Sequence, residues 1–447
     1  MTFKDGILAA RHHLIFLLGL CAAFGLVIYL ENTDITRQAF KVEVSENLPT
    51  REFSPLTEQE LEWAQIAWQY FENNTHQETG LVNSVDGYPA ATMWDTASYL
   101  LGLISAERLG IVDKDEFDWR MRTALTSLAK IELHDGQLPN KSYNARTLAM
   151  VDYQNNITER GIGWSALDIG RLFVPFNVIV WNYPQYTQYV SNITKQWDIN
   201  AMVIDGVMMG AEVTEEGETN YVQEGRIGYE EYAAKSVALT GLDVSVALLY
   251  NDFLQYESIE GVDVPTDKRI PEVYKAHNYV VSEPYILDAI EFGGDAISKE
   301  FAYRVYQAQE NRFLQEGILT AVSEDNIDQA PYFVYNTVFS NGKAWNAITD
   351  TGADASEFRT VSTKAAIGWH MLYDTEYTQK LMDYIDSNYL PEKGWHSGIY
   401  ELDGSKNKAL TANSNAIILE SLHFKANGPL LNISGSRKDE EIEVVMK

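Results

Sequence analysis

The sequence predicts a mainly α-helical protein in which paired helices close into a ring, an (α/α) barrel, preceded by one N-terminal transmembrane helix. Three observations support this fold class. Apolar residues recur at helical spacing, long glycine-bearing loops separate the helical segments, and an uncharged apolar run lies near the start of the chain. The chain has 447 residues, of which 45% are hydrophobic and 12% aromatic, so it can bury a large core.

The apolar run covers residues 14–30. Lys4 and Arg11 precede it and acidic residues follow it, which predicts a cytoplasmic N-terminus and an exported C-terminal part. Its length is near the lower limit of roughly 17–25 residues for a spanning helix. A cleaved signal peptide is the alternative, but no small-x-small cleavage site follows the run. We therefore expect residues 1–31 to be a cytoplasmic stub and signal anchor of a single-pass inner-membrane protein whose C-terminal domain lies in the periplasm.

The segments that flank the central domain have irregular sequences. Residues 32–54 are polar and predict a linker, and residues 426–447 end in a run of charges and predict a loosely ordered tail. Thr57 and Glu60 have the spacing of a capping box, so the first helix of the domain, residues 55–425, should begin there. The single cysteine, Cys21, lies in the apolar run, which leaves the domain without an intrachain disulfide or a cysteine-based metal site.

The helices of the central domain follow a repeated plan. A glycine-rich loop that contains an aromatic residue leads each time into a helix with small and aromatic residues. Such weak repeats, roughly 60–80 residues apart, suit paired helices wrapped into a ring with the long loops gathered at one end. A straight α-solenoid is the alternative, although its repeats are usually shorter and its loops tighter. The repeated segments are 79–110, 161–176, 224–242, 316–339 and 393–424.

Composition narrows the classes of partner. A formal net charge of −30 repels nucleic acid, anionic lipid and anionic polysaccharide, so a neutral polysaccharide or oligosaccharide fits better, although solubility alone also explains such a charge. The 26 tyrosines and ten tryptophans suit a core as well as a sugar-binding site. The sequence contains no phosphate-binding loop, dinucleotide fingerprint, nucleophile elbow or histidine pair at i, i+4. We expect no cofactor and no metal.

Carboxylates beside glycine and aromatic residues are the most informative candidates. Hydrolysis of a sugar linkage needs one protonated carboxyl group and one ionised carboxyl group. An apolar wall raises the pKa of the first, and hydrogen bonds or an arginine keep the second charged. A carboxylate at a helix start can instead be only a cap, and the sequence does not show which groups face each other. The candidates are Asp95, Glu159, Asp168, Glu224 and Glu283.

Two acidic loops carry Asp325 and Asp328, and Asp350 and Asp354. Calcium binding is one interpretation of these loops. The ligand order of an EF-hand is missing, however, so solvated loops are the preferred interpretation.

The chain resembles a known bacterial family, domain of unknown function 3131, over residues 55–425. The resemblance rests on the segments TGLVNSVDGYPAATMWDTASYLLGL, LPNKSYN, ERGIGWSALDIGRL, QEGRIGYEEYAA and VVSEPYILDAIE. The family is more distantly similar to glycoamylase-like (α/α)6-barrel proteins, which include enzymes acting on β-1,2-glucans. The resemblance thus implies an (α/α)6 toroid and a glycan as partner, but it assigns no residue a role.

Together these observations predict a glycoside hydrolase acting on a neutral glucan, with β-1,2-glucan as the candidate substrate and an inverting reaction by analogy. We expect Glu224 to be the general acid and Asp95 the base, with Glu283 as the second candidate for the base. A non-catalytic glycan-binding or scaffold protein of envelope polysaccharide metabolism is the alternative. A lyase on uronic-acid polymers would need a basic site, which this acidic chain does not supply. The expected substrate-binding residues are Trp94, Glu159, Trp164, Asp168, Arg226, Tyr229, Glu231 and Tyr285.

Overall fold

The computed structural model describes residues 42–431, except for Asn251 and Lys275, and scattered positions between His13 and Phe24. Its contacts divide the chain into two units, residues 1–44 and 45–447, of which the second holds nearly all of the described structure. Most of the predicted anchor at 14–30 and the tail from residue 432 lie outside the described residues. Of the helices that can be described, none combines the length and the apolar character needed to cross a membrane.

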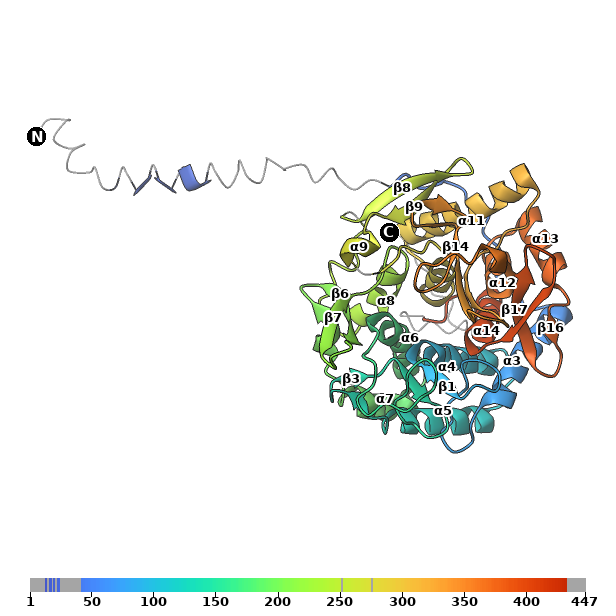
Figure 1. Ribbon diagram of the computed structural model, residues 1–447, viewed down its shortest axis with the longest axis horizontal. Helices are drawn as coiled ribbons and strands as arrows, with labels where there is room; N and C mark the ends of the chain where they lie inside the picture. The colour runs from blue at the N-terminus through green and yellow to red at the C-terminus, as the bar shows by residue number, and fades with distance from the viewer. Residues whose placement is uncertain are drawn as a thin grey trace, which may run out of the picture. The chain divides into compact units, whose positions relative to one another are not determined.

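An inner ring of helices forms the centre of the domain. In the described residues, each of six helices packs against the next, and the last packs against the first, so the ring is closed (Figure 1). The closure excludes the straight solenoid and confirms a helical barrel. A π-helical turn, η3 (Asp288–Phe292), extends the short α10. In ring order the helices are α4 (Met93–Arg108), α6 (Ala166–Asn182), α8 (Tyr229–Ala238), α10 (Glu283–Leu287), α12 (Thr363–Leu372) and α14 (Ala412–Asn427).

Outer helices cover this ring, each packed on an inner helix. They are α3 (Glu58–Asn74), α5 (Lys114–Leu128), α7 (Thr187–Thr194), α11 (Ala296–Glu316) and α13 (Glu376–Ile385). One position departs from this alternation of inner and outer helices. Between α8 and α10 the chain forms an antiparallel hairpin and the short helix α9 (Pro271–Tyr274), and the hairpin packs on α11 where chain order would place an outer helix. The hairpin strands are β8 (Leu254–Ile259) and β9 (Val262–Asp267).

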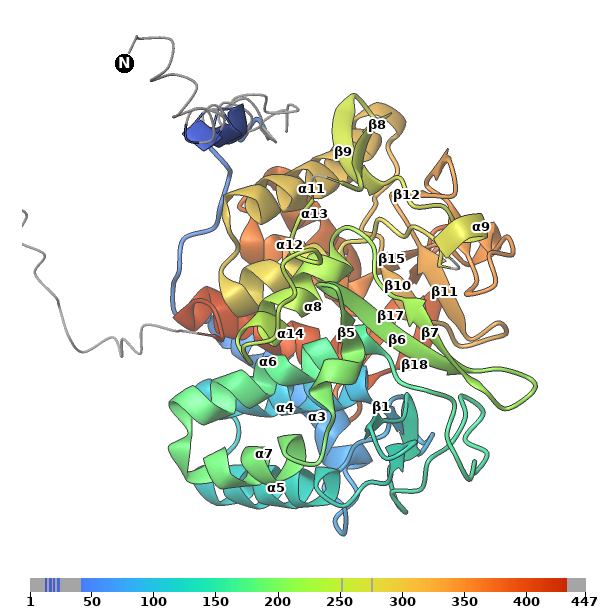
Figure 2. The same ribbon diagram turned by 90° about the vertical axis from the view of Figure 1, so that its left-hand side faces the viewer.

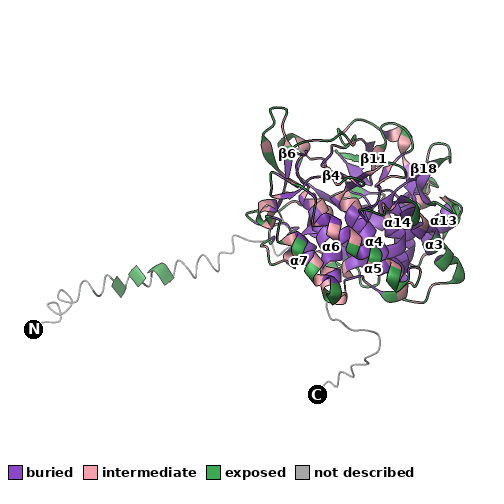
Figure 3. Ribbon diagram, turned by 90° about the horizontal axis from the view of Figure 1, so that it is seen from below, coloured by how far each residue is buried: buried purple, intermediate pink, exposed green. Residues whose placement is uncertain are grey.

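The inner helices are apolar on most faces because neighbours and outer helices cover them (Figure 3). All ten residues of α12 are buried, for example. Glycine permits the closest approaches: a Cβ atom on Gly170 of α6 would lie 2.7 Å from the Cβ of Ala233 on α8. Gly102 of α4 meets Ala416 of α14 in the same way, at 3.4 Å. Small residues therefore set the spacing of the ring.

The inner helices begin at one end of the ring, which we call the front face. The loops that lead into them carry most of the short strands, which gather at that end in Figure 2. The sequence predicted irregular loops here, because strands of two to seven residues interrupted by turns give no sustained alternation. The strands are β1 (Ala90–Thr92), β2 (Leu133–His134), β3 (Leu138–Pro139), β4 (Ser142–Asn144), β5 (Val203–Ile204), β6 (Val207–Val213), β7 (Thr219–Gln223), β10 (Glu324–Asn326), β11 (Phe333–Asn336), β12 (Phe339–Ser340), β13 (Lys343–Ala344), β14 (Ala347–Ile348), β15 (Thr360–Ser362), β16 (Tyr389–Leu390), β17 (Gly394–Tyr400) and β18 (Lys406–Leu410).

These strands form small antiparallel sheets rather than one layer. β1 pairs with β4, β6 lies between β5 and β7, and β11 lies between β10 and β14. β17 pairs with β15, β16 and β18.

The opposite end of the ring, where the inner helices finish, is the back face. Residues 45–54 dock there: the Arg51 N–H donates to the Leu372 carbonyl at 2.8 Å, and the Ser54 N–H donates to the Lys425 carbonyl at 2.9 Å. Phe53 packs edge-on against Phe424. The prediction of a linker over 32–54 is therefore corrected for these residues, which belong to the barrel because backbone hydrogen bonds hold them on α12 and α14.

The C-terminal boundary also moves. Leu430 is fully buried, and its N–H donates to the Ile290 carbonyl at 3.1 Å. The Leu431 N–H donates to the Glu291 carbonyl at 2.8 Å. The barrel thus extends at least to residue 431 rather than ending at 425. The predicted capping box is confirmed, since the Thr57 N–H donates to Glu60 at 2.8 Å and the Glu60 N–H to the Thr57 hydroxyl at 3.2 Å.

Candidate functional site

First-turn residues of the inner helices meet at the front face, and this is where the carboxyl groups gather. Trp94 of α4 contacts Glu283 of α10 and Tyr229 of α8, and Glu283 contacts α12 and α14. Strand β10 adds two more acids. We call this set the front cluster: Trp94, Asp95, Asp168, Glu224, Tyr229, Glu283, Glu324, Asp325 and Lys364.

The side chain of Glu283 is held in place by three donors. It is 2% exposed, and one carboxylate oxygen accepts hydrogen bonds from the Trp94 indole at 3.2 Å and from the Asn413 amide at 2.9 Å. Its other oxygen pairs with the Lys364 ammonium at 2.5 Å. These three donors stabilise the ionised carboxylate and hold both of its oxygens in place.

Lys364 is a buried cation that lies within ion-pair distance of two acidic side chains. Besides Glu283, it lies 3.5 Å from Asp325. Burial alone would lower the pKa of Lys364, but the charges of Glu283 and Asp325 outweigh it and raise that pKa above the usual value. The ammonium is therefore charged in the folded protein and offsets part of the negative charge of the cluster.

Asp168 and Glu224 form a second pair. Asp168 is the third residue of α6, capped by Ser165, and the Glu224 carboxylate accepts the Ala166 N–H at 2.6 Å at the start of the same helix. Burial and then the charge of Glu224 raise the pKa of Asp168 to about 7. Burial also raises the pKa of Glu224, against Lys141 and the backbone N–H groups, which lower it. With a pKa of about 7, Asp168 is partly protonated at neutral pH.

Glycine makes room for Glu224. A Cβ atom on Gly210 of β6 would lie 2.2 Å from the carboxyl carbon of Glu224, so a larger residue there would displace the carboxylate. The next residue after Glu224, Gly225, has a φ of +91°, which a residue with a Cβ adopts only with strain. Both glycines are thus tied to the position of this one acid.

Asp95 connects the two pairs electrostatically. It is half-buried in the first turn of α4 and accepts the Thr92 hydroxyl at 2.7 Å. Burial raises the pKa of Asp95 above its usual value, and the charge of Glu283 adds to the shift. The charge of Asp95 in turn contributes to the raised pKa of Asp168. The charge of Asp95 therefore links the surroundings of Glu283 to those of Asp168.

Glu324 and Asp325 complete the acids. Burial and then the charge of Glu283 raise the pKa of Glu324 to about 8. Burial raises the pKa of Asp325 to about 6, and Lys364 opposes that shift. At neutral pH the front cluster thus contains both protonated and ionised carboxyl groups.

Aromatic rings flank these acids. Trp94 and Tyr229 meet edge to face with centroids 5.6 Å apart, and both are half-buried. Tyr335 lies opposite Glu324 in the pairing of β10 with β11 and stacks on Tyr279 at 3.7 Å. Flat rings therefore lie beside the carboxyl groups of the front cluster.

Two predicted site residues lie away from the front cluster. Trp164 is fully buried, its indole donates to the Met209 carbonyl at 3.2 Å, and it packs on His134 and Tyr221 as part of the core. Glu159 is exposed and lines a separate hollow of about 360 Å³ beside Arg160. The expectation that Trp164 holds a sugar is corrected, because a fully buried indole has no free face. The expectation for Glu159 stays a prediction, at a hollow outside the front cluster.

Three further predicted residues build the start of α8. The Glu231 carboxylate accepts the Gly228 N–H at 2.8 Å and caps the helix. Tyr285 is buried against Gly228, and Arg226 donates to the Ala276 carbonyl at 2.8 Å. These contacts give Glu231, Tyr285 and Arg226 structural partners behind the front cluster.

Sequence reasoning missed Lys364 and Asn413 and did not name Glu324. The segment TKAAIGWHML gave a usable signal, because a lysine within an otherwise apolar helix is buried and needs an acidic partner. Glu324 and Asp325 stood in a loop interpreted as solvated. Within the described part of the chain, no three histidine, cysteine or acidic residues are grouped so that they could hold a metal ion.

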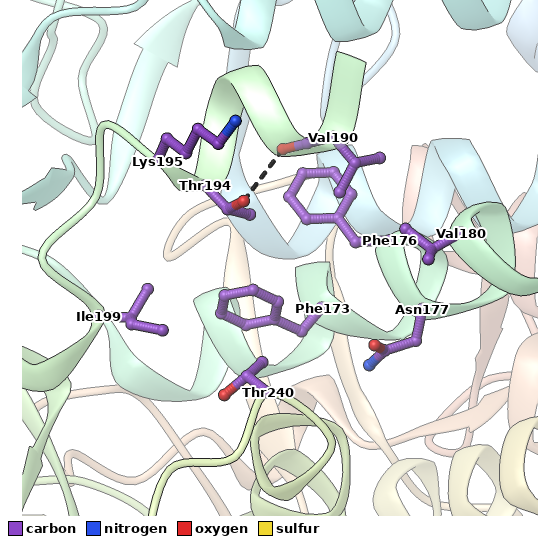
Figure 4. Close-up of a pocket in the computed structure, with 9 residues that line it drawn as sticks. All are labelled: Phe173, Phe176, Asn177, Val180, Val190, Thr194, Lys195, Ile199 and Thr240. Carbon is purple, nitrogen blue, oxygen red and sulfur yellow. Dashed lines mark hydrogen bonds between the residues drawn. The ribbon is translucent and has the colours of Figure 1, made fainter. Parts of the chain in front are cut away.

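An apolar hollow of about 300 Å³ lies between α6 and α7 (Figure 4). Phe173 and Phe176 line it, and the Thr194 hydroxyl at its edge donates to the Val190 carbonyl at 3.1 Å. The residues that line this hollow include no carboxyl group.

The model of a family described as "Protein of unknown function (DUF3131)" matches residues 62–428. The chain belongs to this family. No curated protein matches it in sequence. Among solved structures it is similar to a "putative glucoamylase" from Bacteroides caccae, with a TM-score of 0.59 and 11% identity over 83% of this chain and 94% of that one.

Two glucanase structures are also similar. One is an endo-β-1,2-glucanase from Chitinophaga pinensis in complex with sophorotriose and glucose, with a TM-score of 0.57 and 10% identity over 84% of this chain and 94% of that one. The other is a glutamate-to-glutamine variant of an endo-β-1,2-glucanase from Talaromyces funiculosus with β-1,2-glucan, at a TM-score of 0.54 and 12% identity over 83% and 84% of the chains. At such identities the similarity shows the fold of this family, a glycoside-hydrolase-like helical barrel.

Proposed function

We propose that the protein is a glycoside hydrolase that cleaves a neutral β-glucan at the front cluster. The observation that carries the proposal is the presence of two kinds of carboxyl group in one place. Asp168 has a pKa of about 7, whereas the carboxyl group of Glu283 is held by three donors that favour its charged form. Hydrolysis of a glycosidic bond needs this division of roles.

Asp168 is our choice for the general acid, in place of Glu224. The backbone N–H groups at the start of α6 favour the charged form of Glu224, and that charge favours the proton on Asp168. A carboxyl group with a pKa near the working pH transfers its proton to the leaving oxygen most effectively. Glu224 then has a supporting role, because it keeps Asp168 protonated.

Asp95 is our choice for the base. It is half-buried, and of the two candidates it is the one with contact to solvent, whereas Glu283 is 2% exposed. Both oxygens of Glu283 are occupied, so accepting a proton from water would break an ion pair or hydrogen bonds. Glu283 instead supplies negative charge near the developing oxocarbenium ion.

Charge supports a neutral substrate. The front cluster contains six carboxyl groups and one lysine, so an anionic uronic-acid polymer would be repelled. The enzymes of similar fold are named for action on β-1,2-glucan, which makes that polymer the first substrate to test. Trp94 and Tyr229 would contact its sugar rings.

The test is to incubate the full chain with β-1,2-, β-1,3- and β-1,4-glucans and to analyse the released sugars by chromatography. Release from one polymer, with at least a hundred-fold loss of turnover in Asp168→Asn and Asp95→Asn, is the expected result. Glu159→Gln is the matched control and should retain activity, since Glu159 lies outside the front cluster. Binding without any release of sugar would favour the non-catalytic glycan-binding alternative.

The predicted location also stays a proposal. The uncharged run at 14–30, with basic residues before it and acidic residues after it, supports an inner-membrane anchor with the barrel in the periplasm. Protease digestion of intact spheroplasts tests it: the barrel should become accessible there. Protection of the barrel until the membrane is permeabilised would reject the proposed orientation.

A further inference from the structure

We propose that Arg171, at the centre of the ring, is a positioning residue that fixes the donors around Glu283 through Ser98 and Asn413. The claim about catalysis rests on the proposed function, but the hydrogen-bond chain itself can be tested without any activity. Arg171 belongs to α6, Ser98 to α4, Asn413 to α14 and Glu283 to α10, so the chain crosses the middle of the barrel.

Arg171 is fully buried and tightly held. Its guanidinium donates to the Tyr232 hydroxyl at 2.6 Å and to Glu291 at 2.8 Å, and it lies 3.5 Å from Glu420. Glu291 lies in the π-helical turn η3, and Glu420 lies on α14. A buried guanidinium with two acidic partners and a tyrosine hydroxyl keeps both its charge and its orientation.

A chain of hydrogen bonds leads from this centre to the front cluster. The Arg171 Nε and Nη2 atoms lie 3.4 and 3.3 Å from the Ser98 hydroxyl oxygen. The Ser98 hydroxyl lies 2.9 Å from Asn413 Oδ1, and Asn413 Nδ2 donates to Glu283 Oε1 at 2.9 Å. Every link has both partners on inner helices.

The chain of hydrogen bonds from Arg171 to Glu283 has a fixed donor-to-acceptor direction. A guanidinium can only donate, so Ser98 must accept from Arg171 and has one proton left. That proton points to Asn413 Oδ1 at 2.9 Å or to the Trp94 carbonyl at 3.1 Å, of which the amide oxygen is nearer. With its oxygen engaged, the Asn413 amide presents its NH₂ group to Glu283, which must then accept. The hydrogen-bond chain therefore fixes Oε1 of Glu283 as an acceptor.

A second route reaches the same oxygen. The Arg171 guanidinium lies 4.8 Å from the Trp94 ring centroid, and the Trp94 indole N–H donates to Glu283 Oε1 at 3.2 Å. The cation on one face of the ring fixes the indole plane, and the plane aims the N–H. Both routes end on Oε1, while Lys364 holds Oε2. Arg171 touches no substrate and acts through these residues.

A double-mutant cycle in unfolding by urea tests the chain directly. Ser98→Ala leaves the Asn413 amide free to turn its oxygen toward residue 283, and Glu283→Gln supplies an amide that can pair with either orientation of Asn413. The two changes should therefore be non-additive, with a coupling of about five-fold in the unfolding constant. Ser105→Ala, a buried serine two turns further along α4, is the matched control and should add to Glu283→Gln without coupling. Additivity of Ser98→Ala with Glu283→Gln would overturn the proposal.

Kinetics supply the second readout. In an active wild-type protein, Ser98→Ala and Asn413→Leu should lower kcat about ten-fold with little change in KM and should move the acidic limb of the pH profile. Unchanged kcat and an unchanged limb would reject the positioning role while leaving the proposed function intact. An inactive wild type with coupled stabilities would reject the function and retain the hydrogen-bond chain.

Discussion

Replacing Asp168 by asparagine removes a carboxyl group whose charge the fold disfavours. Burial and the charge of Glu224 raise its pKa from 3.8 to about 7. A raised pKa means that the stability associated with this group is fully present below pH 3.8 and is lost as pH rises through 7. Asparagine does not titrate, and its amide oxygen can still accept the Ser165 hydroxyl. Asp168→Asn should therefore be more stable than the wild type above pH 7.

The size of the expected stabilisation follows from the shift in the pKa of Asp168. About three pKa units at about 1.4 kcal/mol each give roughly 4 kcal/mol as an upper limit well above pH 7. Asp168 is half-buried rather than sealed from water, so screening reduces the gain to roughly 2 kcal/mol. Near pH 4 both proteins carry an uncharged group there, and the difference should vanish.

Urea unfolding of the full chain, followed by tryptophan fluorescence at pH 4 and pH 8.5, measures the difference. Asp118→Asn is the control, because Arg122 lowers the pKa of that exposed carboxyl group and its loss should not stabilise the protein at either pH. A variant that is less stable than the wild type at pH 8.5, or equally stabilised at both pH values, would refute the assignment of Asp168 as a proton-bearing acid.

Three other predictions concern the front cluster. Glucanase activity should fall as pH rises through about 7, and Glu224→Gln should move this fall to lower pH because it removes a charge that raises the pKa of Asp168. A pH–rate profile on β-1,2-glucan measures both effects, and an unchanged profile in the variant would contradict the coupling of the two acids. Lys364→Met should lower the free energy of unfolding by about 3–5 kcal/mol at pH 8, because it removes the cation that pairs with Glu283 and Asp325, and by less at pH 5, where Asp325 takes up a proton. Equal losses in urea unfolding at both pH values would disprove the pairing. Gly210→Ala should lower stability by about 1–3 kcal/mol and displace Glu224, so an unchanged thermal midpoint would show that this space is open.

The sequence was informative where local chemistry decides the outcome. The capping box at Thr57 depends on four consecutive residues, and it formed as predicted. Asp95 and Glu283 were chosen because each precedes or begins a helix beside an aromatic residue, and the closed ring brings such helix starts together. A periodic pattern of apolar residues was enough to predict paired helices.

Other features depend on contacts between distant residues. Glu324 belongs to the front cluster because β10 pairs with β11, the strand that carries Tyr335. A strand of three residues is too short to leave a recognisable pattern in the sequence. Trp164 and Trp94 have similar neighbours in sequence, yet one fills the core and the other is half-buried at the front face. The hairpin of β8 and β9 replaces an outer helix for reasons of packing on α11, which no local signal records.

The position of the two ends of the barrel has a practical consequence. Ser45 and Leu431 both attach at the back face, through Glu300 of α11 and through η3, while the front cluster lies at the opposite end of the ring. A solid support or reporter coupled close to Ser45 or Leu431 therefore leaves the front face turned toward the solution. Every molecule of a layer attached in this way would present the same side.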